Sequence, residues 1–65
     1  MSQIKEYLVT ASCENAFTHK QSIVEMSAYA TSLQSAKMHV YGRIRETYPE
    51  EWVIEIMANE VRKGV

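Results

Sequence analysis

Apolar and polar residues alternate along two stretches in the first half of the chain. Within residues 4–13, Tyr7, Val9, Ala11 and Cys13 alternate with Leu8, Thr10 and Ser12. In residues 18–28, the same holds for Val24, Met26 and Ala28, with Ile23, Glu25 and Ser27 on the other side. Because successive side chains of a strand point to opposite faces, each stretch predicts a β-strand. The polar Glu14-Asn15-Ala16 segment predicts a hairpin turn between them.

A helical period follows at about residues 32–47. One apolar stripe recurs at helical spacing: Leu33, Ala36, Val40, Ile44 and Thr47. Thr31 and Gln34 have the spacing of a capping box, which predicts that the helix begins next to Thr31. Pro49 disfavours helical geometry in the residue before it, so the helix is predicted to end near residue 47.

Alternation returns over residues 51–60 and predicts a third strand. One face is predicted to hold Trp52, Ile54, Ile56 and Ala58, and the other Val53, Glu55, Met57 and Asn59. β-branched and aromatic residues of this kind fit a half-buried pleated surface. Residues 62–65 are interpreted as a polar tail.

These elements predict one α+β domain over residues 1–65, with the order β-β-α-β. The first two strands form a hairpin and are therefore antiparallel. A right-handed crossover through the helix would bring the third strand beside the first and parallel to the second. The expected sheet has the strand order 2-1-3, and the helix packs on one of its faces.

A single helix leaves the other sheet face open. We expect that face to carry Ile23, Val53 and Met57, with Leu8 or Tyr7 depending on the register. Contiguous exposed apolar surface marks interaction sites, and open strand edges accept further strands. A homodimer through the face or an edge is one expectation. The alternative is ordinary scattering of apolar residues over a surface.

Composition narrows the classes of function. The chain has 65 residues, one cysteine and a net charge of −1, and all eight acidic residues are glutamates. It lacks the basic excess of a general DNA-binding protein. No stretch has the length and apolarity of a membrane span, and a single cysteine fits a reducing compartment, so we expect a cytoplasmic protein.

Catalytic chemistry is not expected. Cys13 with His39 is the one thiol pair available, and Cys13 is interpreted as a small core residue. Glu50 and Glu51 are interpreted as solvated loop residues. The cysteine and the two histidines lack metal-ligand spacing, and there is no glycine-rich phosphate loop. We therefore expect neither a metal nor another cofactor, and not an enzyme.

The outward side of the helix holds the candidate binding residues. Gln34, Met38, Tyr41 and Arg45 form a second stripe beside the apolar one. Tyr, Met and Arg are enriched in protein interfaces. The predicted partner-binding residues are Lys37, Met38, Tyr41, Arg43 and Arg45. A solvated helix face is the alternative. Gly42 lies on the solvent side, where a partner can approach the backbone closely or where a surface glycine is simply tolerated.

The element order and the helix start Ser32-Leu33-Gln34-Ser35-Ala36-Lys37 resemble small phage-encoded inhibitors of host machinery. Short type I anti-CRISPR proteins share a hairpin, a helix with a serine-leucine and an alanine-lysine pair, and a final strand. The short coliphage inhibitor of RNA polymerase has the same element order and length. The anti-CRISPR resemblance implies partner contacts by Lys37 and, more loosely, Arg43. This chain departs from that group in Met38 and in its lower net charge.

The leading hypothesis is therefore a phage or mobile-element inhibitor that sterically blocks a host protein or ribonucleoprotein complex such as a CRISPR effector. The second is a small nucleic-acid-binding module that uses Lys37, Arg43 and Arg45, or an accessory subunit. Three cations would give nucleic-acid binding only a modest, salt-dependent strength, so direct nucleic-acid binding is the less favoured hypothesis.

Overall fold

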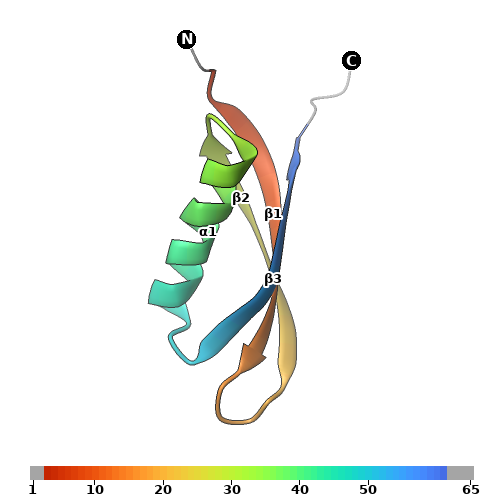
Figure 1. Cartoon of the computed structure of the whole chain (residues 1–65), viewed down its shortest axis with the longest axis vertical. Helices are drawn as coiled ribbons and strands as arrows, with labels where there is room; N and C mark the ends of the chain where they lie inside the picture. Colours follow the sequence, from red (N-terminus) through yellow and green to blue (C-terminus); the bar gives the residue numbers. More distant parts are fainter. Residues whose placement is uncertain (1–2, 62–65) are drawn as a thin grey trace.

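The computed structural model describes residues 3–61 of the chain and contains three strands and one helix. In chain order they are β1 (Lys5–Asn15), β2 (Gln21–Ala30), α1 (Leu33–Thr47) and β3 (Glu51–Glu60). The molecule is elongated, with extents of 43 × 23 × 15 Å, and the helix runs beside the strands (Figure 1). The described residues contain no helix that is long and apolar enough to cross a membrane.

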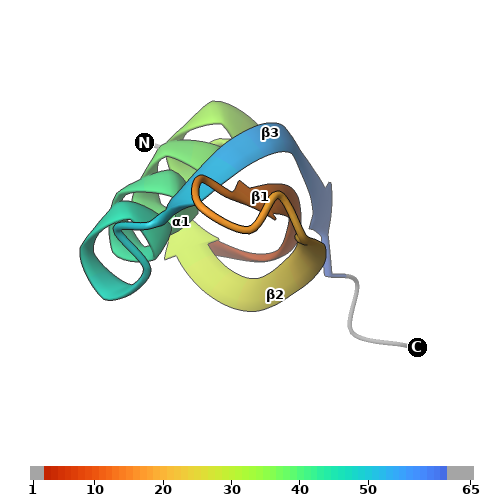
Figure 2. The ribbon, with the colours of Figure 1, turned by 90° about the horizontal axis from the view of Figure 1, so that it is seen from below.

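The sheet has the order β2-β1-β3, as predicted. β1 lies in the centre and pairs antiparallel with both neighbours, so β2 and β3 run parallel to each other at the two edges. Seen from below, α1 lies along one side of a strongly curved sheet (Figure 2). The α+β class and the single-helix layer follow the prediction.

The hairpin differs from its predicted bounds. β1 continues to Asn15, and β2 begins at Gln21 rather than at residue 18. The reason is the side chain of Asn15: its Oδ1 accepts the backbone N–H groups of Phe17 at 2.8 Å and Thr18 at 2.9 Å. His19 then takes a left-handed conformation with φ 61°. These local bonds hold the loop and delay the second strand.

The predicted capping box is wrong by one residue. Ser32 is the N-cap, with extended backbone, and its Oγ accepts the backbone N–H of Ser35 at 3.1 Å. Gln34 is consequently free of a capping role. The helix ends at Thr47, as predicted, and the backbone N–H of Tyr48 donates to the carbonyl of Ile44 at 2.7 Å.

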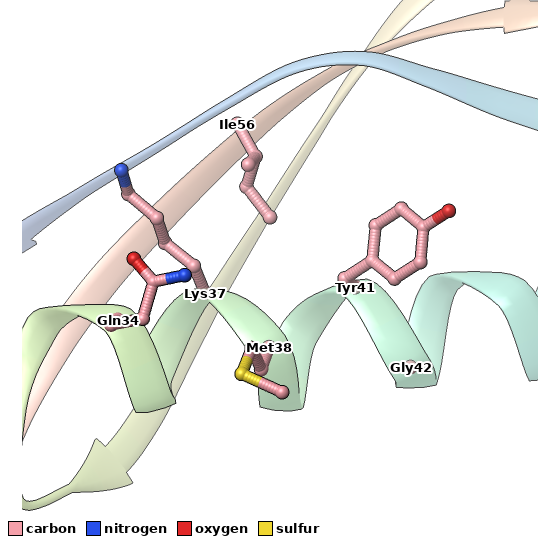
Figure 3. Close-up of a pocket in the computed structure, with 6 residues that line it drawn as sticks. All are labelled: Gln34, Lys37, Met38, Tyr41, Gly42 and Ile56. Carbon is pink, nitrogen blue, oxygen red and sulfur yellow. The ribbon is translucent and has the colours of Figure 1, made fainter.

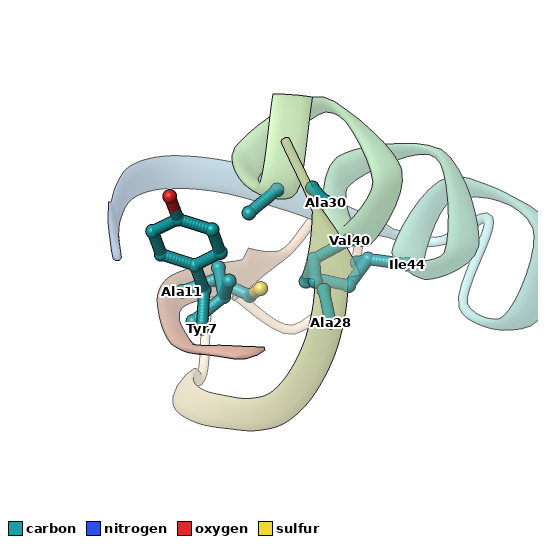
Figure 4. Packing of buried hydrophobic residues seen from close by; sticks show 9 residues of the cluster. Tyr7, Ala11, Ala28, Ala30, Val40 and Ile44 are labelled. Carbon is teal, nitrogen blue, oxygen red and sulfur yellow. The ribbon is translucent and has the colours of Figure 1, made fainter. Parts of the chain in front are cut away.

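The core lies between α1 and the covered face of the sheet (Figure 4). Its buried residues are Tyr7, Val9, Ala11, Cys13, Ala28, Ala30, Ala36, Val40 and Ile44. The predicted alternation of the first strand is thus confirmed. Leu33 and Thr47, at the two ends of the predicted helix stripe, are exposed. Only the three central positions of the stripe reach the sheet.

A β-bulge in β3 overturns the predicted faces of that strand. Ser12 pairs with Glu55, whereas Cys13 pairs with Val53, so Ile54 is an extra residue on β3. A bulge reverses the alternation beyond it. Val53 therefore packs against the core, although we expected it on the open face. Trp52 and Ile54, expected beside Ile56, are instead exposed.

Candidate functional site

A groove runs between α1 and β3 and coincides with part of the predicted binding surface. It has a volume of about 380 Å³ and is lined by Gln34, Lys37, Met38, Tyr41, Gly42 and Ile56. In Figure 3, Lys37 and Tyr41 rise from the helix on either side of Ile56, which points from β3 towards α1. The structure thus brings three of the five predicted residues together.

The groove is open and rich in apolar atoms. Met38 is 65% exposed and Tyr41 is 45% exposed, although both are large side chains. Ile56 is half-buried and forms the inner wall. Lys37 is half-buried too, as expected when a lysine stem covers apolar surface while its ammonium group stays in water. A flexible thioether and an aromatic ring beside a cation are suited to contact with a protein.

Gly42 leaves a gap in the wall of this groove. A Cβ atom placed on Gly42 would meet no atom within 4 Å, so nothing inside the protein requires glycine there. Glycine within a helix costs about 0.5–1 kcal/mol relative to alanine. No contact among the described residues offsets this loss of helix stability. The space beside Gly42 would let an atom of another molecule come close to the helix backbone.

The other two predicted residues lie elsewhere on α1. Arg43 lies on the opposite flank, in a shallow hollow of about 180 Å³ that it shares with His39, Val40 and residues 27–29 of β2. Arg45 is exposed in the last helical turn, where a cation favours the negative end of the helix dipole by about 0.3–1 kcal/mol. The five predicted residues therefore form no single surface.

The helix cations form no ion pairs within residues 3–61. The two ion pairs found there join Lys5 to Glu60 at 3.0 Å and His19 to Glu14 at 3.3 Å. The Lys5 pair raises the pKa of that ammonium group through its hydrogen bond to Glu60. Within the described part of the chain, Lys37, Arg43 and Arg45 are thus available to solvent or to a ligand.

Sequence reasoning missed a second apolar hollow at the hairpin end of the molecule. Residues of the hairpin and of the β3 start line about 420 Å³ there: Ala16, Phe17, Pro49, Glu50 and Trp52. Phe17 is 82% exposed. The sequence offered one indication of this hollow, the aromatic Phe17 in a turn. That Phe17 and Trp52 line the same hollow depends on the tertiary fold.

Glu51 has a structural role, contrary to its interpretation as a solvated loop residue. Its carboxylate accepts the side-chain amide of Asn15 at 2.8 Å and the hydroxyl of Ser22 at 3.1 Å. The backbone N–H of Ala16 also donates to the carbonyl of Glu50 at 2.8 Å. These bonds fasten the hairpin loop to the start of β3 and hold Phe17 near Trp52.

The remaining candidate groups for chemistry do not converge. Cys13 is fully buried in the core, and burial raises the pKa of its thiol, which disfavours the nucleophilic thiolate. His39 is exposed on the flank of α1 that adjoins β2. Across residues 3–61, no three histidine, cysteine or acidic side chains come close enough to hold a metal ion.

The described residues define a class by fold alone: a small α+β domain in which one helix packs on a three-stranded antiparallel sheet. Comparison with protein-family models, with curated proteins and with solved structures found no match. The case for a function therefore depends on the surfaces of the chain itself.

Proposed function

We propose that this chain is a non-enzymatic protein-binding domain and that its partner contacts the groove between α1 and β3. One observation carries the proposal: Met38 and Tyr41 stand exposed over an open groove, beside the bare backbone at Gly42 and beside Lys37, which forms no ion pair within residues 3–61. Binding energy at interfaces concentrates in a few aromatic and long side chains that enter pockets. A groove of this size accepts one or two partner side chains.

The particular role that we propose is that of a phage or mobile-element inhibitor that blocks a host protein or ribonucleoprotein complex sterically, such as a CRISPR effector. The small size, the β-β-α-β order and the helix start at Ser32 support this role. A blocker needs no active site, because occupying a surface is sufficient. Lys37, the residue implied by the resemblance to anti-CRISPR proteins, lines the groove.

Affinity capture tests the proposal. The tagged full-length chain is incubated with bacterial lysate, and retained proteins are identified and quantified by mass spectrometry. We expect a stoichiometric protein complex that is reduced at least about tenfold by Met38→Ala combined with Tyr41→Ala, the effect of losing interface anchors. The matched control is Ile4→Ala, because Ile4 is 71% exposed and lies before β1. Capture of nothing stoichiometric, or equal loss with the control, would contradict the proposal.

Nucleic-acid binding is the second candidate, favoured by the three helix cations without ion partners in residues 3–61. The positions of these cations weaken the case for nucleic-acid binding, because Arg43 lies on the flank of α1 opposite Lys37. Electrophoretic mobility shift with DNA and RNA over a salt series separates the two functions. Binding to phosphates weakens steeply with salt. Absence of a shift at low salt would eliminate this candidate.

A further inference from the structure

The open face of the sheet combines apolar side chains with charge of one sign. The outward side chains in register on β1 and β2 are Glu6, Leu8, Thr10, Ser12, Glu14, Gln21, Ile23, Glu25, Ser27 and Tyr29. Those on β3 are Trp52, Ile54, Glu55, Met57 and Asn59. No lysine or arginine occurs among the outward positions of these three strands. No described helix or strand covers this face (Figure 2).

The bulge in β3 gives this face a hollow. Ile54, the extra residue of the bulge, has no partner on β1, and it lines one hollow together with Ser12 of β1 and Ile23 of β2. Both isoleucines line a depression of about 240 Å³ over Ser12. Ile23 is 73% exposed and Ile54 is 58% exposed. An apolar side chain from another molecule that enters this hollow would remove both isoleucines from water.

Two glutamates lie on the open face close in register to the residues that line the hollow. Glu25 pairs with Thr10 from the β2 side, and Glu55 pairs with Ser12 from the β3 side. Both are exposed, and neither forms an ion pair within residues 3–61. The one lysine of β1, Lys5, belongs to the covered side, where it is bonded to Glu60.

We infer that this face, defined by Ile23, Glu25, Ile54, Glu55 and Met57, is a docking surface for a basic protein segment. The segment presents an apolar side chain to the hollow and flanking lysine or arginine side chains to Glu25 and Glu55. Complementary charge speeds association and selects the partner, and apolar contact contributes most of the affinity.

The same charges argue against other occupants. A symmetric face-to-face dimer would bring the glutamates of two copies together, and like charges across an interface oppose association. Nucleic acids and anionic membranes are repelled for the same reason. A second copy bound through its basic helix is one form of self-association that these charges permit, and the test below detects it.

This surface is independent of the proposed groove, because it lies on the opposite face of the sheet from α1. Failure of the groove to bind a protein leaves the inference standing. Failure of the sheet face likewise leaves the proposed function standing.

The test uses the isotope-labelled full-length chain and a short peptide of alternating leucine and lysine. NMR titration is expected to show shifts at residues around the hollow, such as Thr10, Ile23 and Ile54, and at no comparable level on α1. Affinity should fall as salt rises from about 0.05 to 0.5 M, because exposed charges are screened. The corresponding leucine-glutamate peptide should not bind.

Charge reversal provides the matched controls. Glu25→Lys combined with Glu55→Lys should weaken binding at least about tenfold, whereas Glu46→Lys on the exposed side of α1 should change it less than twofold. Because these glutamates are exposed, the variants should keep the parent melting temperature within a few degrees. Ile54→Ser, a neutral change in the hollow, should also weaken binding.

Several outcomes would overturn the inference. They are equal binding of the two peptides, shifts confined to α1, and affinity that Glu25→Lys with Glu55→Lys leaves unchanged. Shifts confined to the free edge of β2 would indicate strand addition instead. Light scattering that shows concentration-dependent association, abolished by the same double variant, would indicate that the occupant is another copy of the chain.

Discussion

The two faces of the sheet both carry large apolar residues but differ in their burial. The covered face combines Tyr7 and Val9 with the small residues Ala11, Cys13 and Ala28, and all five are buried. On the open face, Ile23 and Met57 are more than half exposed. A helix can approach a sheet closely only where side chains are small, since protein interiors are close-packed. The small residues Ala11, Cys13 and Ala28 therefore give the helix room to approach the covered face.

The open face therefore carries apolar residues that do not pack in the core. An exposed isoleucine contributes little to stability, because most of its surface remains in contact with water. Isolated exposed apolar residues are ordinary, but two isoleucines that line one hollow form a defined surface. Substitutions at matched positions on the two faces test this difference.

The largest effect is expected from Ile44→Ala on α1, where the side chain has no exposed surface. Truncation of a buried isoleucine costs about 2–5 kcal/mol, which is comparable to the whole stability of a domain of this size. The matched change Ile23→Ala on the open face should cost less than about 0.5 kcal/mol. Urea unfolding followed by circular dichroism measures both. Equal costs would show that Ile23 also belongs to a core.

A smaller effect is expected from overpacking the covered face. Ala11→Ile should destabilise by about 1–3 kcal/mol, because Ala11 is fully buried and a larger side chain would have to displace its neighbours in the core. The adjacent change Ser12→Ile points to the open face and should be close to neutral. Thermal unfolding of the two variants gives the comparison directly. If Ala11→Ile were neutral, close helix approach would not explain the small residues.

Gly42→Ala tests the outer side of the helix. It should stabilise the chain by about 0.5–1 kcal/mol, since a Cβ there meets nothing within 4 Å and alanine favours helix. It should also weaken capture of a partner that contacts the helix backbone. Unfolding measurements and affinity capture on the same variant separate the two effects. Unchanged capture would place the partner away from Gly42.

The smallest effect concerns pH. Burial raises the pKa of Cys13 above its ordinary value of 9.0, so above about pH 9 the unfolded chain loses this proton before the folded chain does. The folded state then binds more protons, and stability falls as pH rises. Cys13→Ala should remove this part of the decline. Unfolding curves at several alkaline pH values measure it, and the same slope in both proteins would exclude Cys13 as its source.

A cysteine on the open face sharpens the same comparison. Ser12→Cys in a Cys13→Ala background should react readily with a thiol reagent, whereas Cys13 in the parent protein should react slowly. Cys13 is fully buried, so the reagent cannot reach its thiol, and its raised pKa lowers the fraction of reactive thiolate. Equal reaction rates would mean that the helix-covered face opens frequently.

Much of the candidate groove was predictable from the sequence. The spacing of Lys37, Met38 and Tyr41 relative to Val40 is a property of the helix alone, so the outward stripe could be assigned. Ile56 could not be placed opposite them, because its position depends on how β3 pairs with β1. Arg43 was grouped with the others by charge, yet its position on the helix puts it on the other flank.

The sequence by itself determined the element order, the sheet order, the end of the helix and the covered face of β1. Each follows from local periodicity, from Pro49 and from the handedness of the crossover. The tertiary structure alone decided the faces of β3. Alternation predicts which residues share a face only while the register is unbroken, and the bulge at Ile54 breaks it. That extra residue places Val53 in the core and leaves Trp52 and Ile54 on the surface, where the second docking face is formed.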